Sequence, residues 1–314
     1  MNTRTELVVI GAGLAGLAAA VRASRDGIET VVVESAILGG EAMNALGTGQ
    51  MPGLPTDWDL PAVAAALCEE AAEEGVTFVD GCVTGLARVK DGRVAVRGDE
   101  SDVDAGAVII ASGLRPLPLG IEDEARFKGR GVSNCVACDS PICAGKEVVV
   151  IGGGTEAISS AIHLSTMCPK VTLVHSRASL DAPRRLLAQL RATSNIELML
   201  ASSVSAIYGD GHVEEVAIRR GDAGVENRVP VAGVFVAIGS RPASEPFAQF
   251  VDLTETGRIW VDESLRTSQR NVYAAGSVRM GAIQDAASAI GDGVSAARHV
   301  ELSIRHADHS NDSA

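Results

Sequence analysis

Short runs of consecutive apolar residues recur along the chain, and several of them end in a turn rich in glycine. Residues 6–10 run into residues 11–16 (GAGLAG), and residues 148–151 run into residues 152–157 (GGGTEA). A stretch with the composition of a helix follows each turn. A short apolar run bounded by turn residues is typical of a strand buried in a parallel sheet. The pattern therefore predicts two separate units of strand, tight turn and helix.

Two later segments resemble each other and indicate how these units are connected. Residues 108–116 (VIIASGLRP) and 234–242 (VFVAIGSRP) are both predicted apolar strands followed by Gly-x-Arg-Pro. This repeated pattern indicates an internal duplication. The simplest topology joins residues 1–115 and 243–314 into one domain and inserts residues 116–242 as the other. We therefore expect an α/β protein with two Rossmann-like, three-layer ββα dinucleotide-binding domains, the second inserted into the first.

The first unit carries the fuller dinucleotide signature. Gly11, Gly13 and Gly16 form a GxGxxG motif, and Glu34 ends the next predicted strand. Such glycines allow a pyrophosphate to approach a helix N-terminus, and an acid at this distance suits a ribose 2′-hydroxyl. Together they predict a dinucleotide site.

Farther along, residues 76–96 alternate between apolar and polar positions, which predicts antiparallel strands.

The second unit differs at the ribose position. Its turn contains Gly152, Gly154 and Ala157, but the strand at residues 171–174 is followed by a histidine, a serine and an arginine, with no acid. A basic residue there favours a 2′-phosphate, and hence NADPH over NADH. Two further arginines could add to a phosphate site or could be surface charges on an amphipathic helix. The residues concerned are His175, Ser176, Arg177, Arg184 and Arg185.

A pair of cysteines stands just before the second unit. Cys135 and Cys138 form Cys-x-x-Cys and are followed directly by Asp139. A vicinal thiol pair can close a disulfide and exchange two electrons. The same spacing occurs in half of a zinc site, but no second pair at metal-binding spacing follows, so we predict no metal. Cys143 is a further thiol close to the pair.

Composition narrows the possible partners and the compartment. The 314 residues suffice for about two domains, and 46% of them are hydrophobic. A net charge of −13 would repel nucleic acid, and 3% aromatic residues argue against a stacking platform for single strands. No signal peptide and no apolar stretch of membrane-spanning length is found, and six cysteines in a chain this long do not resemble a secreted framework. We expect a cytoplasmic protein with no nucleic-acid or membrane partner.

Taken in order, these motifs resemble the low-molecular-weight thioredoxin reductases over essentially the whole chain. The resemblance implies FAD in the discontinuous domain, NADPH or NADH in the inserted domain, and a homodimer. It also implies that Cys138 lies against the isoalloxazine, that Cys135 exchanges with the substrate disulfide, and that Asp139 is the acid/base. It extends the cofactor-binding set to the glycine-rich loop after Glu34 and to the last strand and helix. The residues added are Gly40, Glu41, Gln50, Gly276, Ser277, Asp285 and Ala286.

The chain departs from the family pattern at several of these positions. Glu41 replaces a glutamine, Ser277 replaces an aspartate, and Gln284-Asp285-Ala286 replaces Arg-Gln-Ala. In the inserted domain, Ser176 and Asp181 occupy two of the three positions where the family has cations for the 2′-phosphate. We therefore predict weak preference for NADPH, or none.

Three functions are compatible with these residues. The first is an FAD-dependent disulfide reductase that passes electrons from NAD(P)H to the Cys135–Cys138 disulfide and on to a thioredoxin-like protein or a small-molecule disulfide. The second is an FAD- and O2-dependent oxidase of a small-molecule dithiol. The third is a ferredoxin-linked flavoprotein reductase, which needs a basic docking patch that the charge of −13 does not suggest. Asp139, where the oxidases have histidine, favours the first.

Overall fold

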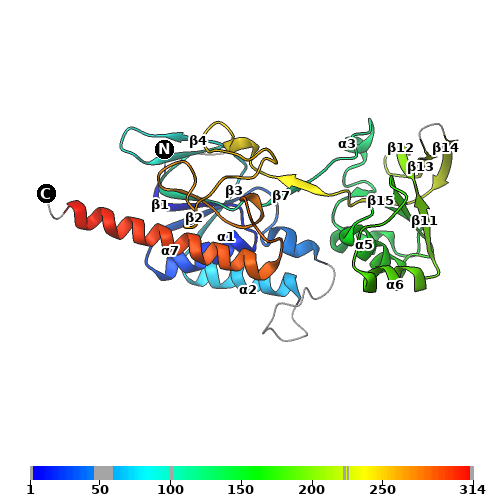
Figure 1. The fold of residues 1–314 in the computed structure, drawn as a ribbon, viewed down its shortest axis with the longest axis horizontal. Helices are drawn as coiled ribbons and strands as arrows, with labels where there is room; N and C mark the ends of the chain where they lie inside the picture. Colours follow the sequence, from blue (N-terminus) through cyan, green and yellow to red (C-terminus); the bar gives the residue numbers. More distant parts are fainter. Residues whose placement is uncertain (1–2, 46–58, 100–101, 222–223, 225, 312–314) are drawn as a thin grey trace. The chain divides into compact units, whose positions relative to one another are not determined.

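The computed structural model describes residues 3–45, 59–99, 102–221, 224 and 226–311, and the chain divides into two units (Figure 1). Unit 1 comprises Met1–Arg115 and Pro242–Ala314, and unit 2 comprises Pro116–Arg241. Both crossings fall within Gly-x-Arg-Pro segments, where the short strands β7 (Leu114–Pro116) and β16 (Ser240–Pro242) pair with each other.

Unit 1 is built on a seven-stranded sheet whose centre is parallel. The strand order is β3-β2-β1-β6-β5-β4, and β17 pairs with β6 in parallel. The central strands contain continuous buried apolar runs, Leu7–Ile10, Val31–Val33 and Ala107–Ile110, because both of their faces are covered there. The strands are β1 (Thr3–Ile10), β2 (Thr30–Glu34), β3 (Thr77–Asp80), β4 (Val83–Arg88), β5 (Val94–Gly98), β6 (Val103–Ile110) and β17 (Val272–Ala274).

The prediction of antiparallel strands over residues 76–96 is right for β4 and β5 and wrong for β3. β4 and β5 form an antiparallel hairpin, and β5 continues antiparallel to β6. β3 instead pairs in parallel with β2. Because β3 lies at the edge of the parallel sheet, its two middle residues are only half-buried and its end residues are exposed, so it lacks the continuous apolar run of a central parallel strand.

Three helices of unit 1 lie together. α1 (Leu14–Arg25) follows the first glycine-rich turn and contacts both α2 (Leu60–Glu73) and the long C-terminal helix α7 (Ala286–Asn311), as Figure 1 shows. α1 is rich in buried alanines, which let its neighbours approach closely. The end of β17, the start of α7 and the glycine-rich turn are thereby brought near one another. Short 3-10 turns are η1 (Gly40–Asn44), η3 (Glu245–Phe247) and η4 (Gly276–Val278).

Unit 2 repeats the layered arrangement on a smaller scale. A parallel sheet in the order β11-β10-β9-β15-β8 is accompanied by an antiparallel sheet in the order β12-β13-β14, and one apolar cluster joins the two sheets. α5 contacts β9, β10 and β11. The elements are α3 (Glu124–Phe127), β8 (Val132–Ser133), α4 (Val136–Asp139), η2 (Ser140–Cys143), β9 (Val148–Ile151), α5 (Thr155–Ser165), β10 (Val171–His175), α6 (Arg184–Ala192), β11 (Ile196–Leu200), β12 (Ser202–Tyr208), β13 (Glu215–Arg220), β14 (Glu226–Pro230) and β15 (Gly233–Val236).

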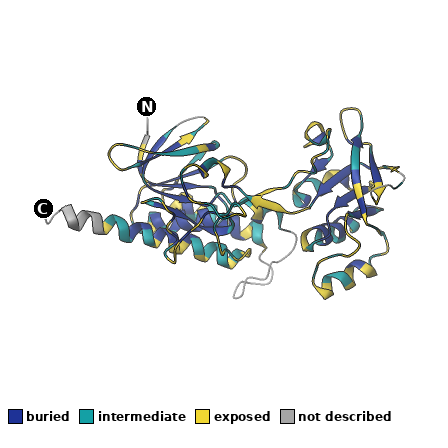
Figure 2. Ribbon diagram, turned by 45° about the horizontal axis from the view of Figure 1, so that its top comes forward, coloured by how far each residue is buried: buried dark blue, intermediate teal, exposed yellow. Residues whose placement is uncertain are grey.

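Each unit has its own apolar core, visible as dark strands in Figure 2. The two predicted long strands are interrupted at glycine. β6 ends at Ile110 and β15 at Val236, and Gly113 and Gly239 take positive φ of 65° and 104° before β7 and β16 begin. None of the helices in the described part of the chain is long and apolar enough to span a membrane.

Candidate active site

The Cys-x-x-Cys pair forms a disulfide at the start of a short helix. Cys135 and Cys138 are bonded, with 5.3 Å between their Cα atoms, and Cys135 is the N-cap of α4. The backbone N–H of Cys138 donates to Cys135 Sγ over 3.0 Å. When the pair is reduced, that N–H would stabilise a thiolate on Cys135, because a hydrogen bond to the charged form favours it. The geometry therefore singles out Cys135 as the better nucleophile of the pair.

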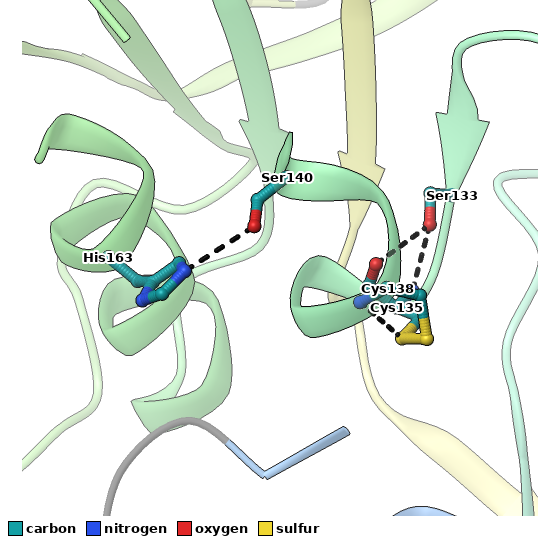
Figure 3. The surroundings of a disulfide bond; sticks show 5 residues. All are labelled: Ser133, Cys135, Cys138, Ser140 and His163. Atoms are coloured by element: carbon teal, nitrogen blue, oxygen red, sulfur yellow. Dashed lines mark hydrogen bonds between the residues drawn. A yellow bond between two sulfur atoms is a disulfide. The ribbon is translucent and has the colours of Figure 1, made fainter. Parts of the chain in front are cut away.

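Neighbouring polar groups fix the backbone around Cys135. The buried Ser133 Oγ accepts from the Cys135 N–H (2.9 Å) and donates to the Cys135 carbonyl (3.2 Å), as Figure 3 shows. Asn134 Nδ2 donates to the carbonyl of Val236, the last residue of β15 (3.0 Å). β8 pairs in parallel with β15 just before the cysteines. The disulfide therefore follows directly after β8, the edge strand of the parallel sheet of unit 2.

The C-terminal side of the pair is fixed by Asp139 and Ser140. The Asp139 N–H donates to the Cys135 carbonyl (3.1 Å), which places this half-buried acid next to both cysteines in the chain. Ser140 Oγ lies 3.4 Å from Nε2 of His163, which reaches it from α5 (Figure 3). His163 therefore supports the start of η2 rather than contacting the sulfur atoms.

The other cysteines of unit 2 have weakly acidic thiols. Burial raises the pKa of the Cys143 thiol, with Asp139 acting in the same direction and Lys146 against it. Burial likewise raises the pKa of the Cys168 thiol, whose Sγ donates to the Cys143 carbonyl over 3.4 Å. Both residues are buried and not disulfide-bonded. They are therefore structural thiols at neutral pH.

The glycines of the first turn are needed for close backbone approach. A Cβ at Gly11, where φ is +100°, would lie 2.5 Å from the carbonyl oxygen of Ala111, and a Cβ at Gly16 would lie 1.9 Å from the carbonyl oxygen of Gly11. At Gly13, the N-cap of α1, no other described residue beyond its chain neighbours has an atom within 4 Å of the place a Cβ would take. The first turn of α1 has neither a side-chain cap nor an acid. Free space beside uncapped N–H groups fits the pyrophosphate of FAD.

Glu34 is held beside this turn. Its Oε2 accepts from the Ala12 N–H (2.7 Å), and its Oε1 accepts from the N–H groups of Ser35 (2.9 Å) and Ala36 (2.8 Å). Three N–H donors orient the carboxylate at the end of β2. This is the position at which an acid meets a ribose hydroxyl in a dinucleotide fold.

Two segments distant in the sequence lie at the same turn. A Cβ at Gly40 would lie 3.1 Å from Gly13 Cα, and a Cβ at Gly276 would lie 2.8 Å from Cβ of Ala15. Ser277 follows Gly276, and its carbonyl accepts from the Arg258 guanidinium. The structure thus brings Gly11, Gly13, Gly16, Glu34, Gly40, Gly276 and Ser277 around the start of α1.

The other predicted residues of the first site have varied positions. Asp285 caps its own helix, since its carboxylate accepts from the Ser288 N–H (2.7 Å) and the Ser288 hydroxyl (3.1 Å). Ala286 packs against the cluster that contains Leu14 and Ala42. Glu41 is exposed in η1. Gln50 lies outside the described residues.

The second turn has the same close approach. A Cβ at Gly152 would lie 2.1 Å from the carbonyl oxygen of Ala237 and 2.7 Å from Cβ of Ala157. Gly154 is the N-cap of α5, which has no side-chain cap. The half-buried His175 ring lies against Gly153, where a Cβ would come within 2.4–2.5 Å of three ring atoms, whereas Arg177 is exposed.

Gly291, Asp292 and Gly293 stand out in the sequence as a stretch of the last helix that could face a cofactor, but the ion pair that Asp292 forms was not predicted. Asp292 of α7 pairs with Arg279, Nε to Oδ2 and Nη2 to Oδ1 both at 2.6 Å, and Oδ2 also accepts from the Gly276 N–H (3.0 Å). The pair is largely buried. It ties α7 to the turn after β17. The two residues are 13 apart in the sequence, so no local pattern reveals their pairing.

Comparison with known proteins supports this description. The chain matches the family described as pyridine nucleotide-disulphide oxidoreductase over residues 5–293. It is 32% identical to thioredoxin reductase of Bacillus subtilis, covering 94% of this chain and 93% of the relative. Among solved structures it is similar to a thioredoxin reductase of T. acidophilum, with 30% identity, a TM-score of 0.85, and coverage of 96% and 99% of the two chains. A thioredoxin reductase of Lactococcus lactis also gives a TM-score of 0.85, at 28% identity over 94% and 97% of the chains.

These similarities establish the fold, the chemistry and the cofactors. The two Rossmann-like units form the α/β fold shared with those structures. FAD and a pyridine nucleotide are the cofactors of such enzymes, and the glycine-rich turn with Glu34 fits FAD. The chain therefore belongs to the pyridine nucleotide-disulphide oxidoreductases and, being similar over nearly its whole length to thioredoxin reductases, is an FAD-dependent disulfide oxidoreductase.

Proposed function

We propose that this enzyme reduces the disulfide of a thioredoxin-like protein or of a small molecule, with NAD(P)H as the source of electrons. FAD would be bound by unit 1 and the nicotinamide nucleotide by unit 2. Bound FAD supplies a two-electron carrier between the nicotinamide and the Cys135–Cys138 disulfide. The observation that carries the proposal is this disulfide, closed at the N-cap of α4 beside Asp139 and held by Ser133.

The thiol chemistry follows from the contacts of the pair. In the reduced enzyme, the Cys135 thiolate attacks one sulfur of the substrate disulfide, forms a mixed disulfide, and releases the other substrate sulfur as a thiolate. Asp139 gives that thiolate a proton. The first proton that Asp139 gives is the one that the Cys135 thiol lost on ionising. The Cys138 thiol then passes its proton to Asp139 and attacks Cys135 Sγ, which restores the enzyme disulfide and releases the second substrate sulfur as a thiolate, and Asp139 protonates that thiolate in turn. Two enzyme thiols are oxidised and one substrate disulfide is reduced, so electrons and protons balance.

Exposure alone would favour Cys138 as the attacking residue, since it is the more exposed of the two cysteines. The assignment to Cys135 rests instead on the hydrogen bond that its sulfur accepts. Single substitutions separate the roles. Cys138→Ser, reduced and mixed with oxidised thioredoxin, should accumulate a mixed disulfide through Cys135, since the resolving thiol is gone. Cys135→Ser should accumulate much less. Non-reducing gels with mass spectrometry of the joined peptides give the readout, and trapping mainly through Cys138 would reverse the assignment.

The donor and the direction of electron flow are tested by thiol counting. Under anaerobic conditions, NADPH or NADH should convert the disulfide into two alkylatable thiols at Cys135 and Cys138. The thiols should disappear again when oxidised thioredoxin is added. If neither nucleotide produces thiols in flavin-loaded protein, the proposed donor is wrong.

A dithiol oxidase is the second candidate, favoured by the placement of Asp181 on the glycine-rich turn of the nucleotide unit. In that reaction a small dithiol would be oxidised to its disulfide, and O2 would be reduced to hydrogen peroxide. The enzyme would then consume one O2 per dithiol in air without any nicotinamide. Oxygen uptake with dithiothreitol as probe distinguishes the two candidates.

We also propose a cytoplasmic homodimer. The free thiols of Cys143 and Cys168 suit a reducing compartment. Light scattering coupled to size exclusion should give a mass of twice the 32.3 kDa chain. A monomer mass at working concentration would contradict the dimer.

A further inference from the structure

The two units can be compared through their glycine-rich turns. In unit 1 the segment after β2 returns to the turn: the Gly39 N–H donates to the Ala12 carbonyl (2.8 Å), and Gly13 and Gly39 form a parallel bridge. In unit 2 the segment after β10 does the same: the Asp181 N–H donates to the Gly153 carbonyl (2.9 Å), and Gly154 and Asp181 form a parallel bridge. Asp181 is therefore the counterpart of Gly39.

This position is tightly packed in unit 1 and carries a charge in unit 2. A Cβ at Gly39 would lie 2.9 Å from Cβ of Ala64 and from Cγ of Met43, and φ there is +97°. Asp181 is exposed and lies beside Gly154, the N-cap of α5. No side chain caps the N–H groups in the first turn of this helix. A helix N-terminus attracts anions. The Asp181 carboxylate thus adds a negative charge next to a site for phosphate groups.

Asp181 stands among cations in the sequence. Residues 176–183, which join β10 to α6, contain Arg177, and Arg184 and Arg185 begin α6; all three arginines are exposed. The His175 imidazole lies against Gly153, and burial, followed by the charge of Arg177, lowers its pKa, so it is neutral at neutral pH. By contrast, the counterpart strand of unit 1 ends in an acid suited to a ribose hydroxyl, Glu34.

We infer that unit 2 takes a pyridine dinucleotide with a free adenosine 2′-hydroxyl, the NADH class, and that Asp181 discriminates against a 2′-phosphate. The inference rests on the proposed function, because it assumes that unit 2 binds the nicotinamide nucleotide. A carboxylate near a phosphate dianion at a protein surface lowers affinity by about tenfold. The backbone bond from Asp181 to Gly153 is independent of the side chain, so substitution leaves the loop in place.

The test is binding of two adenosine nucleotides that differ only in the 2′-phosphate. Calorimetric titration of the FAD-loaded protein with adenosine 2′,5′-bisphosphate and with 5′-AMP gives an affinity ratio without any turnover. Wild type should bind 5′-AMP at least as tightly as the bisphosphate. Asp181→Asn should shift the ratio toward the bisphosphate by about tenfold, and Asp181→Arg by more. Asp210→Arg, at an exposed acid in the turn between β12 and β13, makes the same charge change and should leave the ratio unaltered.

Three results would overturn the inference. They are a wild type that binds the bisphosphate ten times or more tightly than 5′-AMP, equal shifts from Asp181→Arg and Asp210→Arg, or no binding of either nucleotide to wild type or to the Asp181 variants. A parallel measurement separates this failure from that of the proposed function. Chemically reduced enzyme should reduce one equivalent of thioredoxin disulfide whatever nucleotide binds. If the reduced enzyme fails to reduce thioredoxin but binds the two nucleotides with the expected affinity ratio, the proposed function is refuted and the inference about Asp181 is not.

Discussion

At the scale of single residues, the cysteines have distinct chemical roles that depend on their surroundings. Cys135 accepts a hydrogen bond from a helical N–H, which favours its thiolate. Cys143 and Cys168 lie in the interior of the same unit, where burial favours the neutral thiol. The chain therefore places an exchangeable pair close to thiols that do not compete with it.

This difference predicts the pattern of alkylation. Iodoacetamide at neutral pH should leave Cys143 and Cys168 of the native oxidised protein unmodified, because their raised pKa and burial suppress the reactive thiolate. After mild reduction the new label should appear at Cys135 and Cys138. Peptide mass spectrometry reads each site. Labelling in urea after reduction is the control, and all six cysteines should then react. Rapid native labelling of Cys168 would contradict the structural role given to it.

His175 predicts a pH dependence of nucleotide binding. Because its pKa lies below the usual 6.5, protonation adds a cation beside Gly153 only as the pH falls below that value. Affinity for adenosine 2′,5′-bisphosphate should therefore rise on acidification relative to the His175→Gln variant. The phosphate titrates identically with both proteins, so the difference between the two curves isolates the histidine. Parallel curves would show that the imidazole does not face the nucleotide.

At the scale of elements, the first site depends on how closely α7 approaches α1. A Cβ at Gly293 would lie 2.0 Å from the carbonyl oxygen of Ala15 and 3.0 Å from the N atom of Ala19. Asp292, the residue before Gly293 in α7, pairs with Arg279 and so connects this part of the helix to the segment after β17. The positions of Gly276 and Ser277 therefore depend on helix packing as well as on their own strand.

Two glycines in the same helix give a matched test of that contact. Gly293→Ala should destabilise the protein by about 1–3 kcal/mol through overpacking, and FAD retention should fall with it. Gly291→Ala should instead stabilise the helix by about 0.5–1 kcal/mol, because no residue in the described part of the chain, outside the adjoining turns of α7 itself, comes within 4 Å of the new Cβ. Urea unfolding and the flavin-to-protein absorbance ratio give both readouts. Equal effects of the two substitutions would contradict the close α1–α7 contact.

At the scale of the whole molecule, the two units differ in charge. Residues 116–241 contain 13 acidic and 13 basic residues, so the net charge of −13 belongs to unit 1. The unit that carries the disulfide is therefore neutral. The overall acidity of the chain does not exclude an acidic protein partner at the cysteines, which weakens the charge argument against a ferredoxin-like carrier.

Separate cores predict separate local stability. Phe247 is buried in the cluster of unit 1 and Phe127 in that of unit 2, both 1% exposed. Replacing either by alanine should cost about 3–5 kcal/mol of local packing. Hydrogen exchange should then accelerate in the strands of the substituted unit: β1 and β6 for Phe247→Ala, and β9 and β15 for Phe127→Ala. Equal acceleration in both units would show that the chain opens as one cooperative body.

Much of the molecule could be predicted from local patterns. The apolar runs, the GxGxxG turn with Glu34, and the Cys-x-x-Cys-Asp segment each lie within a short stretch, and short-range geometry determines what they form. Gly11 and Gly16 are required by contacts within a single strand–turn–helix unit and its neighbouring strand. The prediction is wrong for β3 because an edge strand of a parallel sheet is partly exposed and so lacks the continuous apolar run of the central strands.

The sequence by itself therefore determined the elements, the duplicated plan, the family and the redox pair, because each is specified by residues close together in the chain. Only the tertiary structure decided which distant residues meet. In the structure, the Asp292 carboxylate accepts a hydrogen bond from the Gly276 N–H, and Gly293 packs closely against Ala15. Asp181 pairs with the second glycine-rich turn, as Gly39 pairs with the first. Such contacts depend on how helices and loops return to a turn after many intervening residues, and the spacing of residues along the chain carries no record of that path.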